Sequence, residues 1–321
     1  MSERDLPAGP CPRPEDVDYD LDRALSSVVF LRTRIPEDAL TADVLGTERS
    51  GHGVVIQDSG LIVTIGYLIT EAEQVWIIDK DGGAIPGYAV GFDQASGFGL
   101  VQALQKLKAP PLPIGSANTL SSNETVVVAG HGGRQDAVKV HVAAKQEFAG
   151  YWEYMLDEAI FTHPAHPNWG GAALIGPDGT LRGIGSLLVQ TSANGDNSES
   201  NMIVPIDLLL PVMEDLQTLG RPRQPPHPWL GMMTTEMKGN LVIINLVDGC
   251  PAELAGVQAG DVVLAVNGQS TDDLATFYRL IRGLGPAGTD IPLTLLRHGE
   301  TVDVVVHSVS RYDYLKKPGL H

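Results

Sequence analysis

Short apolar runs separated by polar turns make up most of the chain up to residue 206. Many of the runs are rich in Val, Ile and Leu, and turn tripeptides such as Asp-Ser-Gly at 58–60 and Pro-Asp-Gly at 177–179 separate many of them. Short strands at this spacing predict a sandwich or barrels. The predicted strands cover residues 26–33, 51–66, 74–79, 87–93, 99–104, 124–131, 137–145, 159–164, 181–189 and 201–206.

The pattern changes after residue 205. Apolar residues recur at helical spacing over 205–220, and Gly220 is placed to cap this helix at its C-terminus. A Pro-rich linker follows at 221–226. Beyond it, the pattern predicts strands over 229–237, 241–247, 261–268 and 290–309, the last a hairpin turning at 298–300, with helices over 251–257 and 271–284.

Composition supports a chain of several domains with ample core. The 321 residues are 43% hydrophobic, and 36 Gly and 22 Pro are typical of a mostly β chain with many turns. With 22 basic and 39 acidic residues the net charge is −17, so we expect no binding to nucleic acid or to an anionic membrane surface. No run of 18 apolar residues occurs, so we expect no membrane span.

The first 20 residues are polar and Pro-rich and predict a disordered or loosely docked arm. They lack the basic-then-apolar pattern of a signal peptide, which favours the cytoplasm, or the periplasm if a leader has been removed. Cys11 and Cys250 are too few for a disulfide framework, and we expect no bridge between them.

The C-terminal region resembles the PDZ domain that follows the protease domain of bacterial HtrA/Deg proteins. The resemblance is carried by "WLGM" (Trp229–Met232), by "GCPAELAGVQAGDVVLAVNGQ" (Gly249–Gln269) and by the helix after it. The long ordered run makes this similarity specific.

The region before it resembles the trypsin-like double β-barrel of the same family. The similar segments are "SGHGVVIQDSGLIVTIGYLI" (50–69), "VGFDQASGFGLVQAL" (90–104) and "HPNWGGAALIGPDGTLRGIGS" (166–186). The resemblance implies a mostly β fold with an N-terminal arm (1–20), a trypsin-like domain (21–220), the linker (221–226), a PDZ domain (227–310) and a tail (311–321).

The chain departs from the family at each catalytic position. The resemblance places Tyr67 where the family has its His, Gly99 where it has Asp and Trp169 where it has the nucleophilic Ser. Pro167 replaces the Gly whose N–H contributes to the oxyanion hole.

These four residues lack the chemistry of a serine protease. A tyrosine titrates near ~10 and is a poor base at neutral pH, Gly has no side chain to orient a base, and an indole is only a hydrogen-bond donor. Proline has no N–H, and loss of one oxyanion donor costs about 2.7–4 kcal/mol of barrier. We therefore predict that the chain is not an enzyme.

Other polar residues near these positions could form a relocated site. The candidates are His163, His166, Asp157 and Glu158 near residue 169, and Ser96 and Asp93 near residue 99. We expect the two histidines to be solvated loop residues, and His52 and His131 to be turn residues. No metal or other cofactor is predicted. Trp169 is interpreted as a plug of the old cleft or, alternatively, as a platform for a partner segment.

The PDZ-like groove keeps its chemistry. Backbone amides of "WLGM" can hold a terminal carboxylate, and the strand after it offers an edge for an added peptide strand. The predicted peptide-binding residues are Trp229, Leu230, Gly231, Met232, Thr234, Phe277, Tyr278 and Ile281, with Leu274 and Ile281 alternatively packing the domain's own core.

Three functions remain open from the sequence. The first is a catalytically inactive HtrA/Deg-like scaffold that binds a protein or peptide partner through the PDZ groove. The second is an active serine endopeptidase with a rebuilt site, and the third is a subunit of a larger complex or homo-oligomer.

Overall fold

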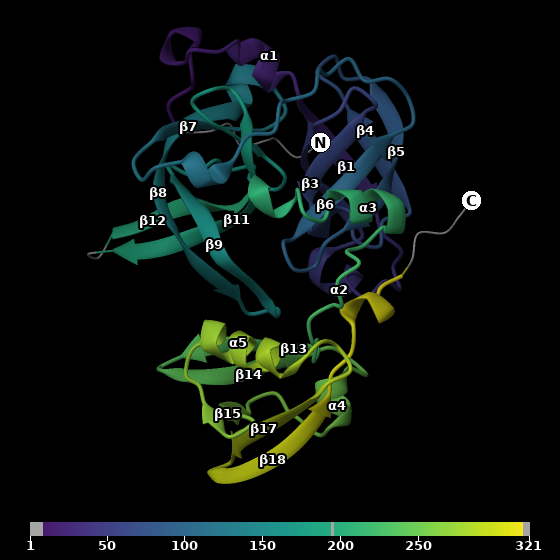
Figure 1. Cartoon of the computed structure of the whole chain (residues 1–321), viewed down its shortest axis with the longest axis vertical. Helices are drawn as coiled ribbons and strands as arrows, with labels where there is room; N and C mark the ends of the chain where they lie inside the picture. Colours follow the sequence, from purple (N-terminus) through teal and green to yellow (C-terminus); the bar gives the residue numbers. More distant parts are fainter. Residues whose placement is uncertain (1–8, 194–195, 317–321) are drawn as a thin grey trace. The chain divides into compact units, whose positions relative to one another are not determined.

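Within the described residues, the strands form two closed barrels and one further sheet. A computed structural model describes residues 9–193 and 196–316 (Figure 1). Contacts divide the chain into two compact units, of which the second consists of Glu147–Asp157 and Gln224–Leu315 and the first contains the rest. The expected mostly β architecture is confirmed.

The first barrel has the strand order β1-β2-β3-β6-β5-β4. Its interior is formed by β-branched and aliphatic side chains, and every residue of β3 is buried. The short α2 (Ala42–Leu45) and η2 (Gly66–Leu68) connect strands of this barrel. The strands are β1 (Val28–Arg34), β2 (Glu48–Val55), β3 (Leu61–Ile65), β4 (Gln74–Ile78), β5 (Ala84–Phe92) and β6 (Phe98–Ala103).

The second barrel closes in the order β10-β11-β12-β9-β8-β7 around a core of Val, Leu, Ile and Ala. Its two long antiparallel strands β8 and β9 are joined at a tip that belongs to the second compact unit. The strands are β7 (Thr125–Ala129), β8 (Ala137–Gly150), β9 (Tyr154–His163), β10 (Ala173–Ile175), β11 (Leu181–Ala193) and β12 (Asp196–Pro205).

The described part of the N-terminal arm is docked rather than disordered. Asp16, in the short η1 (Pro14–Asp16), pairs with Lys139 at 3.0 Å, and the backbone N–H of Lys139 donates to Pro10. The helix α1 (Leu21–Leu25) begins at Asp20, whose carboxylate accepts from the N–H of Arg23. The rest of the predicted arm, residues 1–8, lies outside the described residues.

The helix expected over 205–220 is shorter than predicted. One turn, η5 (Ile206–Leu208), is followed by α3 (Met213–Leu219), because Pro211 between them has no N–H and disfavours a helical residue before it. Gly220 ends α3 at φ 73°, in the left-handed conformation that favours glycine, so the predicted cap is confirmed.

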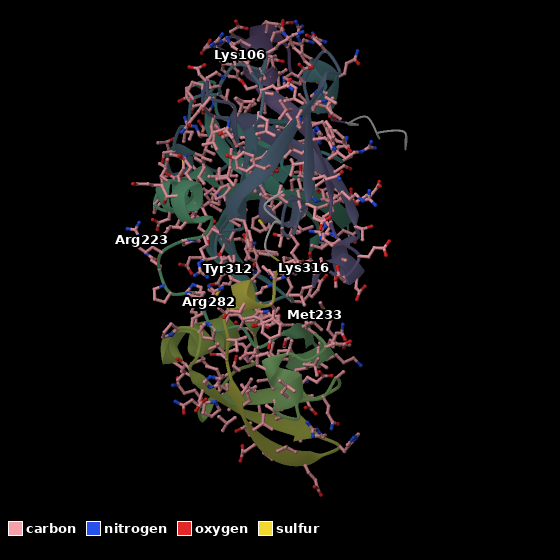
Figure 2. All side chains as sticks on the ribbon, turned by 90° about the vertical axis from the view of Figure 1, so that its right-hand side faces the viewer. Lys106, Arg223, Met233, Arg282, Tyr312 and Lys316 are labelled. Atoms are coloured by element: carbon pink, nitrogen blue, oxygen red, sulfur yellow. The ribbon has the colours of Figure 1, made fainter. Side chains whose placement is uncertain are left out.

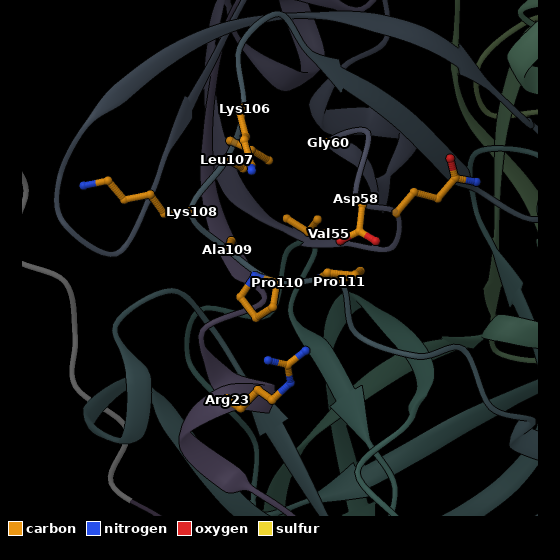
Figure 3. Close-up of a pocket in the computed structure, with 11 residues that line it drawn as sticks. Arg23, Val55, Asp58, Gly60, Lys106, Leu107, Lys108, Ala109, Pro110 and Pro111 are labelled. Carbon is orange, nitrogen blue, oxygen red and sulfur yellow. The ribbon is translucent and has the colours of Figure 1, made fainter.

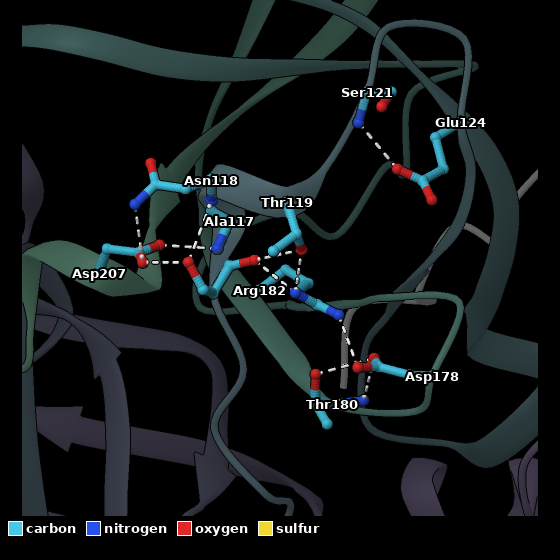
Figure 4. Close-up of polar contacts among 10 residues, drawn as sticks. Ala117, Asn118, Thr119, Ser121, Glu124, Asp178, Thr180, Arg182 and Asp207 are labelled. Carbon is cyan, nitrogen blue, oxygen red and sulfur yellow. Dashed lines mark hydrogen bonds and ion pairs between the residues drawn. The ribbon is translucent and has the colours of Figure 1, made fainter.

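A polar network fixes the segment between the barrels to the second barrel (Figure 4). Asp207 accepts hydrogen bonds from the N–H of Ala117 at 2.6 Å and from the Ser116 hydroxyl at 2.5 Å, where η3 (Ala117–Thr119) begins. Arg182 donates to the Thr119 hydroxyl at 2.6 Å and to Asp178 at 2.6 Å. Side chains of the second barrel thus replace the missing backbone partners of this short helix.

The second unit is built on the sheet β13-β14-β15-β17-β18, with β16 paired to β15. Both α5 (Leu274–Leu284) and α4 (Pro251–Leu254) contribute side chains to its core. The side chains of Met233 on β13 and Arg282 on α5 are labelled in Figure 2. The strands are β13 (Met232–Met237), β14 (Asn240–Leu246), β15 (Val262–Val266), β16 (Gln269–Ser270), β17 (Asp290–Arg297) and β18 (Glu300–His307).

Helix α5 begins after Asp273, whose carboxylate accepts from the N–H of Thr276. The last short element is η6 (Arg311–Asp313), and η4 (Gly133–Asp136) precedes β8. Cys11 and Cys250 are both free thiols. Among the described residues, no helix is long and apolar enough to cross a membrane.

We expect Asp207→Ala to lower the free energy of unfolding by about 1–2 kcal/mol, since it removes a cap and leaves polar groups without partners. Urea denaturation followed by circular dichroism measures this change. Glu37→Ala, at an exposed carboxylate of the same unit, is the control. Equal midpoints for the two variants would contradict a stabilising role for Asp207.

Candidate functional site

Tyr67 lies in η2, directly after β3. Its hydroxyl donates to the backbone oxygen of Ser186 at 3.0 Å and lies 2.8 Å from the position that a Cβ atom on Gly170 would take. Burial raises the pKa of Tyr67 above its usual value of 10, and a hydrogen bond with the Trp169 side chain opposes only part of this rise. The phenol therefore stays protonated at neutral pH and is no general base.

Gly99 lies on β6, opposite Thr64 of β3. A Cβ atom at position 99 would lie 2.8 Å from Cδ1 of Ile69 and 3.1 Å from Cα of Gly66. This position is therefore closed by packing, and an aspartate there would need Ile69 and the backbone at Gly66 to move.

The loop with Trp169 is fixed by strands of both barrels. The N–H of His52 on β2 donates to the oxygen of Gly170 at 2.8 Å, and the N–H of Gly171 donates to Gly185 on β11 at 2.9 Å. Gly171 has φ 79°, and a Cβ atom there would lie 1.9 Å from the oxygen of His52, so only glycine fits. Trp169 itself is half-buried.

These contacts bring residues 67, 99 and 169 into one region, since Tyr67 meets the loop at 169–170 and follows Gly66, which faces Gly99. The convergence is what the family resemblance implied for the three positions. None of the three side chains can supply a nucleophile, a general base or an orienting carboxylate.

One of the two loop histidines differs from the sequence expectation. His166 is fully buried, with Nδ1 accepting from the N–H of Asn168 at 3.0 Å and Nε2 donating to the backbone oxygen of Asp136 at 3.1 Å. Burial lowers the pKa of His166. His163 is half-buried, and its Nδ1 lies 3.0 Å from the oxygen of Glu199. The prediction of a solvated loop residue is wrong for His166, because its ring is fully buried, whereas His163 is half-buried at the end of β9.

His52 and His131 form another pair. His52 lies within β2 and is buried rather than in a turn, because its N–H pairs with the loop at Gly170. The N–H of His131 donates to Nδ1 of His52 at 3.0 Å, and Nε2 of His131 lies 3.0 Å from the oxygen of Asp79.

The other candidates for a relocated site have local roles. Asp93 accepts from the N–H groups of Ala95 and Ser96, both at 3.0 Å, and so closes a turn. Glu158 pairs with Lys145 at 3.1 Å, whereas Asp157 belongs to the second unit. The hydrogen bonds of Asp93 and the ion pair of Glu158 thus stabilise a turn and two neighbouring strands of the fold.

A separate pocket of about 360 Å³ is lined by 11 residues, drawn in Figure 3. Arg23, Lys106 and Lys108 contribute positive charge to it, and Lys108 also pairs with Asp81 at 2.8 Å. Its lining shares no residue with the region around Tyr67 or with the loop at Trp229.

The loop before β13 holds the side-chain carboxylate of Glu153. Three successive backbone N–H groups, those of Leu230, Gly231 and Met232, donate to the Glu153 carboxylate at 2.9, 2.7 and 3.0 Å. Gly231 has φ 79°, and a Cβ atom there would lie 2.3 Å from Cβ of Cys250, which explains the glycine. Glu153 was missed by sequence reasoning because it lies far away in the chain and carries no motif of its own.

The other residues that the sequence predicted for the groove contact the hairpin between β8 and β9 or belong to the core of the second unit. The N–H of Thr234 on β13 donates to the oxygen of Tyr151 at 2.9 Å. The hydroxyl of Tyr278 on α5 donates to the oxygen of Gly150 at 2.8 Å and accepts from the N–H of Glu153 at 3.2 Å. The apolar members are buried in the core of the second unit, which also contains Met155: Trp229, Leu230, Met232, Leu274, Phe277 and Ile281.

Comparisons with known proteins agree with this architecture. Residues 51–184 match the trypsin-like peptidase domain family, and residues 242–297 match the PDZ domain family. The chain is HtrA-like. The solved structures it resembles include an HtrA-type protease AlgW with a decapeptide (TM-score 0.54, 18% identity, 93% of this chain and 98% of that chain). Another is a serine endoprotease from Yersinia pestis (TM-score 0.51, 23% identity, 91% and 98%).

Curated relatives carry protease names. A probable periplasmic serine endoprotease, DegP-like, from Hahella chejuensis is 25% identical over 86% of this HtrA-like chain and 58% of the relative. The serine endoprotease DegS from Haemophilus influenzae is 25% identical over 82% of this chain and 78% of the relative. The chain spans a little over half the length of the DegP-like relatives.

The prediction that the chain is not an enzyme is corrected by these relatives. They are named serine endoproteases, and this points to protease activity. Because Tyr67, Gly99 and Trp169 lack the required chemistry, such activity needs a nucleophile and a base at other positions.

We expect Glu153 to titrate near neutral pH, because burial raises its pKa to about 7 even though three N–H groups and the charge of Arg311 favour the carboxylate. The folded pKa lies above the usual 4.5, so the bound proton stabilises the folded unit below about pH 4.5, and this contribution is lost as the pH rises through 7. Carbon-13 NMR of the glutamate carboxyls measures the titration. Glu153→Gln identifies the resonance. A Glu153 midpoint at the usual 4.5 would contradict the effect of burial.

Proposed function

We propose that this HtrA-like protein recognises the C-terminal ends of polypeptides through its PDZ domain. The observation that carries the proposal is the set of three N–H groups, at Leu230, Gly231 and Met232, that converge on one carboxylate. A chain end offers the same group, and charge-assisted hydrogen bonds to backbone N–H groups are among the stronger ones.

The neighbouring residues would set the fit of the peptide. The edge strand β13 provides Thr234, whose N–H can bind a peptide carbonyl, as it binds Tyr151. Phe277, Tyr278 and Ile281 of α5 are buried in an apolar core that also contains Met155, from the hairpin between β8 and β9. We infer that an apolar residue at the chain end fits this groove.

A second candidate function, serine endoprotease, is favoured by the names of the curated relatives. It rests on the trypsin-like domain with a rebuilt site, since positions 67, 99 and 169 do not carry the chemistry.

We also infer that the protein acts in the periplasm, because the DegP-like relatives are named as periplasmic. The expectation of a cytoplasmic protein has no support from these relatives. A protein or peptide partner, and assembly with further copies or subunits, belong to this proposal.

We expect the full-length protein to bind a fluorescent peptide with an apolar C-terminal residue in the micromolar range, about −8 kcal/mol, because one added strand and one pocket are engaged. The same peptide with an amidated C-terminus should bind much more weakly, since it lacks the carboxylate. Fluorescence anisotropy measures both. Equal affinity for acid and amide would show that no carboxylate is captured.

For the endoprotease function, we expect a fluorophosphonate probe to label a serine of the protein. The label should persist in Tyr67→Phe and Trp169→Phe, since neither residue supplies the base or the nucleophile. Mass spectrometry of the labelled peptide locates the serine, and changing that serine to Ala is the control. Absence of any labelling in folded protein would count against this function.

A further inference from the structure

The carboxylate-binding loop of the PDZ domain is already occupied by a segment of the same chain. We propose that the tip between β8 and β9 is an internal ligand of the PDZ groove, and that a polypeptide C-terminus binds by displacing it. This inference rests on the proposed function and adds its regulation.

The carboxylate of Glu153 takes the place that a chain end would take. Both of its oxygens are used, one bound by Leu230 and the other by Gly231 and Met232. Glu153 has φ 59°, a left-handed conformation that is uncommon for a residue with a side chain. This strained backbone is held in place by the contacts of its carboxylate and its N–H group.

The backbone of the tip also occupies the strand edge. The oxygen of Tyr151, two residues before Glu153, accepts from the N–H of Thr234 on β13. A carboxylate in the loop and a carbonyl on the edge strand are the two contacts by which a peptide adds to such a sheet. The tip therefore blocks both.

Further contacts hold the tip against α5 and the core. The Tyr278 hydroxyl bridges the oxygen of Gly150 and the N–H of Glu153. Met155 is buried within the hydrophobic core of the domain, and Glu147 forms an ion pair with Arg279 on α5. These contacts explain why Glu147–Asp157 forms one compact unit with the PDZ domain.

The tip has an advantage over a peptide in solution because it belongs to the same chain as the groove. Both ends of the tip continue into strands, so it stays near the groove at a high effective concentration. A peptide in solution can bind only to the fraction of molecules in which the groove is open, and its apparent dissociation constant is raised by the inverse of that fraction.

The test compares peptide affinity in the full-length protein and in Glu153→Ala. If the tip occupies the groove in at least nine of ten molecules, the variant should bind the free-acid peptide about 10-fold more tightly or better. Glu153→Gln keeps the shape of the side chain but not the charge, and should give an intermediate gain. Glu300→Ala removes an exposed charge from the same unit and should bind like the unchanged protein.

Hydrogen exchange provides the second readout. The amides of residues 230–234 should exchange faster in Glu153→Ala than in the unchanged protein or in Glu300→Ala, and circular dichroism should show all variants folded. A saturating free-acid peptide should speed exchange of the tip amides in the unchanged protein, whereas the amidated peptide should not.

The outcomes separate the two proposals. Equal peptide affinity in the unchanged protein and in Glu153→Ala would overturn the internal ligand while leaving peptide recognition intact. Equal exchange of residues 230–234 in the two proteins would overturn it as well. Failure of every variant, including folded Glu153→Ala with an open loop, to bind the free-acid peptide would overturn the proposed function and displacement together.

Discussion

Three backbone N–H groups that point at one carboxylate are the interaction that holds the hairpin tip in the carboxylate-binding loop of the second unit. A loop that turns sharply at Gly231 cannot pair these donors within its own sheet, and buried donors without partners are costly. The chain satisfies them with Glu153, a residue from a hairpin tip far away in the sequence. The backbone strain at Glu153 and the raised pKa of its carboxyl group follow from that arrangement.

In our proposal the same three N–H groups bind the C-terminus of a polypeptide and hold the tip between β8 and β9. Donors arranged for a carboxylate do not distinguish a chain end from a glutamate side chain that reaches them in the right geometry. Selectivity then comes from the backbone around the carboxylate, namely the carbonyl of Tyr151 that accepts from the N–H of Thr234 and the backbone groups that contact Tyr278. The tip supplies all of these contacts. Its occupancy of the groove depends on them and also on its covalent connection to the two strands, which keeps it close to the loop.

The trypsin-like domain keeps the double-barrel scaffold, while Tyr67, Gly99 and Trp169 lack the chemistry of a serine-protease triad. Gly171 still turns where only glycine fits, and the loop at Trp169 is still fixed between β2 and β11. Around it, Ile69 fills the space beside Gly99, and Tyr67 donates to Ser186. The fold can therefore persist without the chemistry, because packing maintains the scaffold whereas a reaction depends on a few side chains.

The sequence by itself determined the mostly β fold and the order of the trypsin-like and PDZ domains, because strand patterns and turn residues are local features. From their order along the chain it predicted that Tyr67, Gly99 and Trp169 stand at the catalytic positions. Only the tertiary structure decided that His52 and His166 are buried, that Pro211 divides the helix before the linker, and that Glu153 fills the loop. Burial and partner choice depend on which distant segments meet, and a glutamate in a hairpin tip shows no local sign of the donors that it will satisfy.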